Sequence, residues 1–442
     1  MKLLIKNGRV INPATQQDEI QDVLIEDRRI LQVGTAGSLK AEQKYADTDP
    51  QAEMKVVDAT GCFVMPGFVD LHVHFRDPGL TYKEDIETGA KAAARGGVTT
   101  VCAMPNTKPV VDSVETLDYV QKKAKDKAVI HVEQLSAVTI GQEGIRLVDM
   151  KGMADKGAIA FSEDGKSVMD SALYAEAMKQ AAELGAVIMA HCEDKALVRG
   201  GVLNQGVASE RFGVPGITNS VEDIITARDI FLAKDHGTTL HLCHCSTAGS
   251  VELVRMAKRM GVSVTAEVCP HHFTLTDADI EKEDANYKMN PPLRSETDVQ
   301  ALIRGLQDGT MEVISTDHAP HSREEKAKGF LEAPFGIVGL ETSASLTYTA
   351  LVATGLLSPM QMAEKMSWNP AKVIGIQEER GSIEVGKLAD IVIFDPDAEY
   401  VVDTEKFASR GKNTPYEGKQ LKGQVIMTIC EGRIVYQDGG NL

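Results

Sequence analysis

The chain has 442 residues, which is too many for one ordinary hydrophobic core but fits a barrel with a smaller domain. Hydrophobic residues make up 43% and charged residues 25%, a composition typical of globular proteins and not of disordered or membrane proteins. The net charge of −17, without any basic patch, argues against nucleic acid as a partner, and no apolar run reaches the length of a membrane span.

Residues 1–64 and 381–442 both show short strand patterns separated by turns. The expected strands are 2–6, 22–26, 30–33 and 55–57 near the N-terminus, and 390–394, 425–430 and 433–436 near the C-terminus. Neither end has enough strands for a stable domain of its own. We therefore expect one small β-sandwich domain built from both termini, with residues 65–380 inserted between them.

In residues 65–380 the pattern changes to short apolar runs that alternate with helical segments. The expected strands are 69–75, 98–104, 128–135, 158–161, 186–190, 239–243, 262–268 and 311–315. The expected helices are 82–94, 114–125, 172–184, 220–235, 247–260 and 296–308. Nearly continuous apolar character is typical of parallel strands buried on both faces. The alternation predicts the α/β class and a (β/α)8 TIM-like barrel.

Histidines and aspartates gather where these strands end. His72 and His74 close the first strand two residues apart, so both imidazoles are expected to face one point, as zinc ligands do. Further imidazoles and carboxylates follow later strands at Asp164, His191, His244, Asp317 and His321. Because catalytic residues of such barrels lie at the carboxyl ends of the strands, this set indicates a site for two metal ions.

The seven cysteines predict a reducing environment. They are odd in number and scattered through apolar segments, which favours free thiols in a cytoplasmic protein. The N-terminus also lacks the apolar run of a signal peptide. Cys243-His244-Cys245 has the composition of a metal cluster, but on a strand the two thiols would face away from His244, so we expect small buried side chains here.

Several motifs in order along nearly the whole chain resemble those of the dihydroorotases in the amidohydrolase superfamily. The first is Pro-Gly-Phe-Val-Asp-Leu-His-Val-His-Phe-Arg-Asp-Pro-Gly at 66–79. The others are Ala-Met-Pro-Asn-Thr (103–107), Ala-His-Cys-Glu (190–193), Lys-Met-Asn-Pro-Pro-Leu-Arg (288–294), Thr-Asp-His-Ala-Pro-His (316–321), Ala-Pro-Phe-Gly (333–336) and Lys-Asn-Thr-Pro-Tyr (412–416). The chain is most similar to the stand-alone bacterial type, in which an aspartate bridges the metals.

The resemblance implies a set of metal ligands for two Zn²⁺ ions per subunit. They are His72, His74 and Asp317 for one ion, His191 and His244 for the other, and Asp164 between the two. Many amidohydrolases use a carboxylated lysine in place of the bridging aspartate. Glu163 and Lys166 are therefore the alternatives to Asp164. Imidazole and carboxylate ligands suit zinc, but also manganese or cobalt.

The resemblance also implies a reaction, the reversible cyclisation of N-carbamoyl-L-aspartate to (S)-dihydroorotate and water in de novo pyrimidine (UMP) biosynthesis. A hydroxide bridging the two metals attacks the ring carbonyl, and Asp317 carries the proton to the leaving nitrogen. The implied substrate-binding residues are Arg76, Asn106 and His321 at the free carboxylate, Asn290, Phe335 and Gly336 at the ring, and His74. Residues 322–334 are expected to form a loop that closes over the site.

Two other functions compete with this one. Hydantoinases, dihydropyrimidinases and allantoinases share the barrel, but they typically use a carboxylated lysine and need no carboxylate clamp. Arg76 and the absence of lysine from 158–162 disfavour them. A non-catalytic dihydroorotase-like partner of aspartate transcarbamoylase is disfavoured because every implied ligand position is filled. The sequence leaves open a homodimer and an association with aspartate transcarbamoylase.

Overall fold

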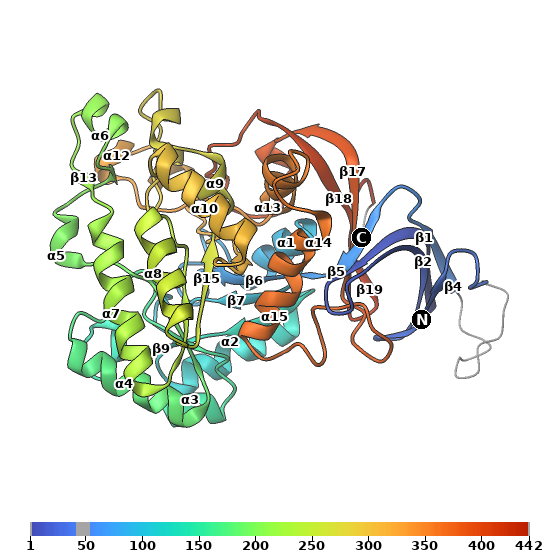
Figure 1. Cartoon of the computed structure of the whole chain (residues 1–442), viewed down its shortest axis with the longest axis horizontal. Coiled ribbons are helices and arrows are strands. Elements are labelled where there is room, and N and C mark those ends of the chain that lie inside the picture. Colours follow the sequence, from blue (N-terminus) through green and yellow to red (C-terminus); the bar gives the residue numbers. More distant parts are fainter. Residues whose placement is uncertain (1, 41–53, 441–442) are drawn as a thin grey trace.

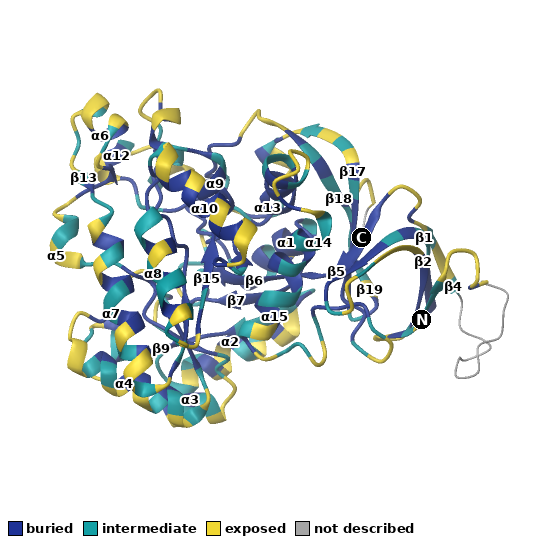
Figure 2. Cartoon of the chain, viewed as in Figure 1, coloured by how far each residue is buried: buried dark blue, intermediate teal, exposed yellow. Residues whose placement is uncertain are grey.

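The computed structural model describes residues 2–40 and 54–440. A barrel surrounded by helices occupies one side of the molecule, and a β-sheet that holds both ends of the chain occupies the other (Figure 1). Strands fill the buried centre of the barrel, and the outward faces of the surrounding helices are exposed (Figure 2). The predicted fold class, a (β/α)8 barrel with a β-rich part from both termini, is confirmed.

The barrel is built from parallel strands in chain order. They are β6 (Phe68–Val73), β7 (Val98–Ala103), β8 (His131–Gln134), β9 (Ser136–Ala137), β10 (Phe161–Ser162), β11 (Val187–Ala190), β14 (Thr239–Leu242), β15 (Val264–Val268) and β16 (Val313–Ile314). Every ladder between them is parallel. A parallel bridge between Val73 and His318 brings the last strand back to the first and closes the barrel.

Helices that return the chain between strands form the outer layer. They are α1 (Ile86–Arg95), α2 (Val114–Lys127), α3 (Met150–Asp155), α4 (Ser171–Leu184), α7 (Ser220–His236), α8 (Ala248–Arg259), α10 (Glu296–Asp308), α13 (Ser343–Thr347), α14 (Pro359–Ala363) and α15 (Asn369–Val373). Their ends follow the local sequence: the Asp85 side chain caps α1, and Gly185, at a φ of 65°, ends α4. None of the helices within 2–40 and 54–440 combines the length and apolar character needed to span a bilayer.

Shorter elements lie in the loops at the carboxyl ends of the barrel strands. They are α5 (Lys195–Val198), β12 (Leu203–Asn204), α6 (Val207–Phe212), β13 (Gly216–Ile217), α9 (Pro270–Thr274), α11 (Arg323–Lys326) and α12 (Gly329–Glu332). The predicted closing loop 322–334 thus contains two short helices, α11 and α12. Its closure over the site stays a prediction.

The terminal sheet joins strands from both ends of the chain. Its members are β1 (Lys2–Asn12), β2 (Gln17–Glu26), β3 (Arg29–Thr35), β4 (Met54–Asp58), β5 (Phe63–Pro66), β17 (Ile391–Val401), β18 (Gln420–Cys430) and β19 (Arg433–Gln437). Strand order is β19-β18-β17-β5-β1-β2-β3, with β4 paired to β1. Because β5 pairs with β17, the two termini share one core, which includes Ile5, Val64 and Ile393. The domain boundaries 1–64 and 381–442 stay a prediction.

Candidate metal centre

Asp164 lies at the centre of a group of imidazoles at the carboxyl end of the barrel. Its Oδ1 is 3.2 Å from His72 Nε2, 3.4 Å from His191 Nδ1 and 3.5 Å from His244 Nε2. Its Oδ2 faces the other way and lies 3.5 Å from His74 Nε2. One carboxylate therefore lies within reach of four imidazoles, and its two oxygens allow it to be shared between two cations.

Asp317 completes the group beside the first two histidines. Its Oδ1 is 3.0 Å from His74 Nε2 and 3.6 Å from His72 Nε2. Burial alone would raise the pKa of Asp317, but the hydrogen bond from His74 and the neighbouring imidazoles lower it to about 2. The side chain is therefore ionised at neutral pH and can accept a proton or bind a cation.

Three residues of this region have backbone conformations that are rare for side chains other than glycine. Arg76, His244 and Asp317 have φ values of 60°, 33° and 50°. Each such conformation costs about 1–3 kcal/mol, and such outliers cluster at functional sites. The left-handed turn at His244 directs its ring toward Asp164, although the residue follows the end of β14.

The unpaired atoms of this group fit a bound cation. His72 Nε2, Asp164 Oδ1 and His191 Nε2 are buried and have no hydrogen-bond partner among the described residues. His191 Nδ1 also lies only 2.8 Å from His244 Nε2, so two ring nitrogens face each other closely. Buried polar atoms are normally satisfied, and cations bound around Asp164 would satisfy its Oδ1 and His72 Nε2. Imidazole nitrogens and carboxylate oxygens are donors that zinc accepts.

Glu267 forms hydrogen bonds with the histidines of this group. The sequence analysis did not predict this role. Its Oε1 is 2.9 Å from His72 Nδ1 and accepts the backbone N–H of His244 at 3.0 Å, and its Oε2 is 3.0 Å from His241 Nε2. Metal-binding imidazoles are commonly oriented by a carboxylate on the second ring nitrogen. The signal that could have revealed it is a carboxylate inside the apolar strand 264–268, because a buried charge must be paired.

Asn106 contacts two of the predicted ligands. Its Oδ1 lies 2.9 Å from His74 Nδ1, and its Nδ2 donates to Asp164 Oδ2 at 3.2 Å. The sequence analysis predicted it at the substrate carboxylate. In the structure its amide orients the ring of His74 and the carboxylate of Asp164.

The two alternatives to Asp164 are engaged elsewhere. Glu163 Oε2 accepts the backbone N–H groups of Val138 and Thr139 at 3.2 Å and 3.0 Å. Lys166 Nζ donates to the carbonyl of Gln142 at 3.0 Å. Of the three side chains at the end of this strand, Asp164 is the one that meets the histidines.

Arg76 and His321, which the sequence predicts to bind a carboxylate, lie close together beside the predicted metal ligands. Arg76 Nη2 is 3.5 Å from His321 Nε2, and Arg76 Nε donates to the carbonyl of Pro320 at 3.4 Å. Burial, together with the charges of Arg76 and Lys83, holds the pKa of His321 far below its usual range. Within the described part of the chain, Arg76 forms no ion pair with a carboxylate, although its guanidinium lies near the charges of Asp317 and Asp164.

The residues predicted to contact the ring of the substrate already form hydrogen bonds within the protein. The Asn290 Nδ2 donates to Glu193, whose Oε2 lies 3.7 Å from His191 Nε2. The carbonyl of Phe335 accepts from His321 Nε2 at 2.8 Å. Gly336 has a φ of 125°, and an added Cβ would lie 2.6 Å from Ala319 Cβ, so the backbone here requires glycine.

Two family models match separate parts of the chain. Residues 61–250 match the family model described as "Dihydro-orotase-like", and residues 337–436 match the "Amidohydrolase family" model. The chain is 48% identical to the dihydroorotase of Pelotomaculum thermopropionicum over 438 residues, with 99% of each chain covered. It is 49% identical to that of Clostridioides difficile over 434 residues, covering 98% of this chain and 99% of the relative.

Solved structures show the same architecture. The L-hydantoinase (dihydropyrimidinase) from Arthrobacter aurescens superimposes with a TM-score of 0.88 at 28% identity, covering 100% of this chain and 97% of that one. The dihydropyrimidinase from Brevibacillus agri NCHU1002 gives 0.84 at 26% identity, covering 99% and 95%. Fold and site define an amidohydrolase, a metal-dependent hydrolase of cyclic amides. Within this class, the chain belongs to the dihydroorotase family.

Proposed function

We propose that this hydrolase interconverts N-carbamoyl-L-aspartate and (S)-dihydroorotate plus water, a step of de novo pyrimidine biosynthesis, with two zinc ions. The naming of its relatives as dihydroorotases supports the reaction. The single observation that carries the choice of substrate is Arg76, a half-buried guanidinium next to the proposed metal ligands that forms no ion pair with a carboxylate within the described residues.

Arg76 distinguishes dihydroorotate from the substrates of other cyclic amidases. Dihydroorotate carries a free carboxylate, whereas dihydrouracil and hydantoin do not. A guanidinium binds a carboxylate through two parallel hydrogen bonds. The substrate therefore supplies the missing partner. The neutral His321 ring lies beside Arg76, and its two nitrogens are held by Lys83 Nζ at 3.2 Å and by the carbonyl of Phe335 at 2.8 Å, so the ring positions this end of the site.

The residues that would hold the zinc ions are those whose donor atoms meet around Asp164. Our proposed ligands are His72, His74 and Asp317 for one ion, His191 and His244 for the other, and Asp164 for both. Bound zinc supplies Lewis-acid polarisation of the amide carbonyl and a hydroxide at neutral pH. Glu267 and Asn106 fix the ring orientations of His72 and His74.

Asp317 moves the proton in this proposal. Its low pKa keeps it ionised, so it can accept the proton of the attacking water. It then donates this proton to the ring nitrogen as the C–N bond breaks, which gives the open-chain carbamoyl product. In the direction of cyclisation, Asp317 takes the proton from the ureido nitrogen and passes it to the departing carboxylate oxygen, which takes a second proton from solvent and leaves as water.

The proposal also covers the compartment of the protein and its partners. All seven cysteines are free and buried, which fits a reducing compartment, and we propose the cytoplasm. The substrate is a small molecule, and no nucleic acid partner is expected from the net charge of −17. A homodimer and an association with aspartate transcarbamoylase stay predictions.

A comparison of substrates tests the proposed function. The purified, zinc-loaded protein is assayed for hydrolysis of dihydroorotate, dihydrouracil and hydantoin under the same conditions. We expect kcat/KM to be highest for dihydroorotate by at least tenfold, which corresponds to about 1.4 kcal/mol. A preference for dihydrouracil or hydantoin would place the chain's activity with the other cyclic amidases.

A further inference from the structure

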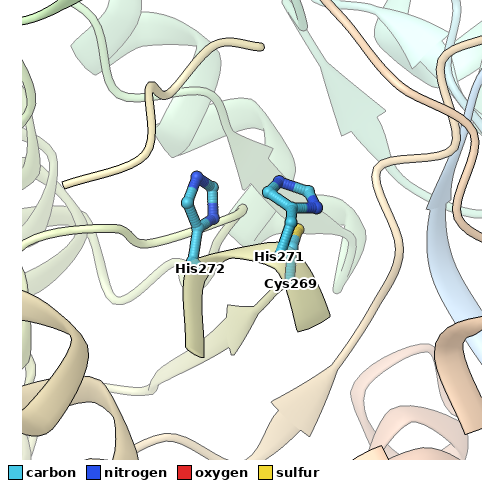
Figure 3. A group of neighbouring side chains, drawn as sticks. All are labelled: Cys269, His271 and His272. Atoms are coloured by element: carbon cyan, nitrogen blue, oxygen red, sulfur yellow. The ribbon is translucent and has the colours of Figure 1, made fainter. Parts of the chain in front are cut away.

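A second group of potential metal ligands lies at the carboxyl end of β15. Cys269, His271 and His272 each offer a donor atom, and these three atoms lie within 4.8 Å of one another. Figure 3 shows the two imidazoles side by side above the start of α9, with the sulfur of Cys269 below the ring of His271. None of the three is among the proposed ligands around Asp164.

The local structure explains why these side chains meet. Cys269 is the N-cap of α9 and has an extended backbone, with φ −87° and ψ 147°. Pro270 occupies the first helical position, where its missing N–H is tolerated, so His271 and His272 take the second and third positions. An N-cap side chain points toward these two positions. The thiol forms no cap hydrogen bond, so its sulfur remains available.

His272 has the hydrogen bonding of a metal ligand. Its Nε2 lies 3.0 Å from the carbonyl oxygen of Pro291, and because a carbonyl can only accept, Nε2 carries the proton. Nδ1 of the neutral ring is then a bare lone pair, and it is buried without a partner. Metal-binding histidines commonly donate their other N–H to a backbone carbonyl in this way.

His271 adds a second unsatisfied nitrogen. Its Nε2 is also buried and has no hydrogen-bond partner among the described residues. The ring centroids of His271 and His272 are 4.2 Å apart, so both lie in the same small volume. Buried polar atoms without partners destabilise the folded state, and packing of the two rings against each other leaves both nitrogens uncompensated.

The protonation of these groups suits a cation that binds through nitrogen and sulfur. Burial lowers the pKa of His272 to about 4 and that of His271 well below its usual range, so both rings are neutral. Burial, with a contribution from nearby Asp317 and Glu267, raises the pKa of the Cys269 thiol well above its usual range. A bound cation would displace the thiol proton, and the same carboxylates would offset part of its charge.

We propose that Cys269, His271 and His272 bind a further metal ion of the zinc type, separate from the ions around Asp164. One thiolate and two imidazoles are a donor set that zinc and cobalt accept, whereas magnesium and calcium prefer oxygen. Three protein ligands leave the fourth tetrahedral position for water or another small ligand.

Cobalt provides a spectroscopic test that does not depend on catalysis. The proposed ligands around Asp164 include no thiolate, so a thiolate-to-cobalt charge-transfer band in the near ultraviolet reports a different site. The full-length protein is loaded with Co²⁺ and its spectrum is compared with those of two variants. Cys269→Ser removes the proposed sulfur ligand. Cys243→Ser is the matched control, because Cys243 is buried within 4.8 Å of donor atoms of His72 and Glu267.

The proposal expects the band in the native protein and in Cys243→Ser, and its loss in Cys269→Ser. Absence of the band from the native protein, retention in Cys269→Ser, or loss in Cys243→Ser would each overturn it. Elemental analysis of zinc-loaded protein gives a second measurement. His272→Gln is expected to hold one ion per chain fewer than the native protein, and an unchanged metal content would contradict the proposal even if Cys269→Ser failed to fold.

Discussion

Glu267 and His72 are joined by a contact of 2.9 Å between Oε1 and Nδ1, and both side chains are fully buried. Because Glu267 takes the Nδ1 side of the ring, the Nε2 side is left facing Asp164 at 3.2 Å. Burial would raise the pKa of Glu267, but its hydrogen bonds with His241 and His72 hold it far below its usual range. The position of His72 thus depends on an ionised carboxylate from a different strand.

Replacing Glu267 with Gln should weaken metal binding. The amide keeps the shape but removes the negative charge and one acceptor, and loss of such a partner typically reduces metal affinity by about 10–100-fold. Titration against a chelator of known affinity measures the change. Glu163→Gln is the matched control, since Glu163 bonds Thr139 and Val138 instead of a proposed ligand. Equal zinc affinity of Glu267→Gln and the native protein would refute the role of Glu267.

Arg76→Met should weaken dihydroorotate binding. Loss of a charge-assisted hydrogen bond costs about 1.5–3 kcal/mol, and this should appear mainly in KM. Steady-state kinetics of native and variant protein give the value. Arg28→Met serves as the control, because Arg28 is exposed and pairs with Glu431 at the surface, outside the predicted closing loop. If KM for dihydroorotate stayed the same in Arg76→Met, the carboxylate clamp would have to lie elsewhere.

Asp317→Asn should abolish most turnover. The amide cannot accept the proton, and general acid–base catalysis contributes about 10²–10⁴-fold to the rate. Metal content and circular dichroism are measured on the same samples, because Asp317 is also a proposed ligand. A variant with native metal content and a rate reduced in this range supports the proton transfer. Full activity in a folded variant would exclude it.

Lys326 should make stability depend on pH. Its buried Nζ lies 3.1, 3.0 and 2.9 Å from the carbonyl oxygens of Lys288, Pro334 and Gly336. Burial lowers the pKa of Lys326 to about 7. In the unfolded chain a lysine titrates near 10.4, so between these two values the unfolded state binds the extra proton and stability rises with pH, by at most about 1.4 kcal/mol per unit.

Urea unfolding of native protein and Lys326→Met, at about pH 7.5 and about pH 9.5, checks this expectation. The native protein should gain more stability than the variant between the two conditions. An equal change in both proteins would show that Lys326 does not titrate in this range.

The barrel could be predicted because each of its strands is indicated by a short, local run of sequence. Buried parallel strands require runs of apolar residues, so predicted 239–243 and 262–268 correspond closely to β14 and β15. The ends of the strands were predicted less accurately. The strand predicted at 158–161 is β10 at Phe161–Ser162 in the structure, because its pairing with β9 and β11 determines which residues form the strand. A β-rich domain shared by both termini followed from the number of strands each terminus could supply, but β5, the strand that pairs with β17, was not among the predicted strands.

The supporting residues of the site could not be predicted because their partners are distant in sequence. Glu267 meets His72 across 195 positions, and Asn106 meets Asp164 across 58. No periodic pattern in the sequence indicates that residues so far apart are paired. Strand alternation also gave no direction for His244, whose side chain is set by a left-handed turn after the strand has ended.

Metal removal and return tests the central claim most directly. The protein is stripped with a chelator, its metal content is determined, and dihydroorotate hydrolysis is measured before and after zinc is added. We expect the stripped protein to be inactive and the zinc-treated protein to recover its rate as the ions rebind. Full hydrolysis by protein shown to be free of metal, or no hydrolysis by protein shown to be fully loaded, would contradict the account.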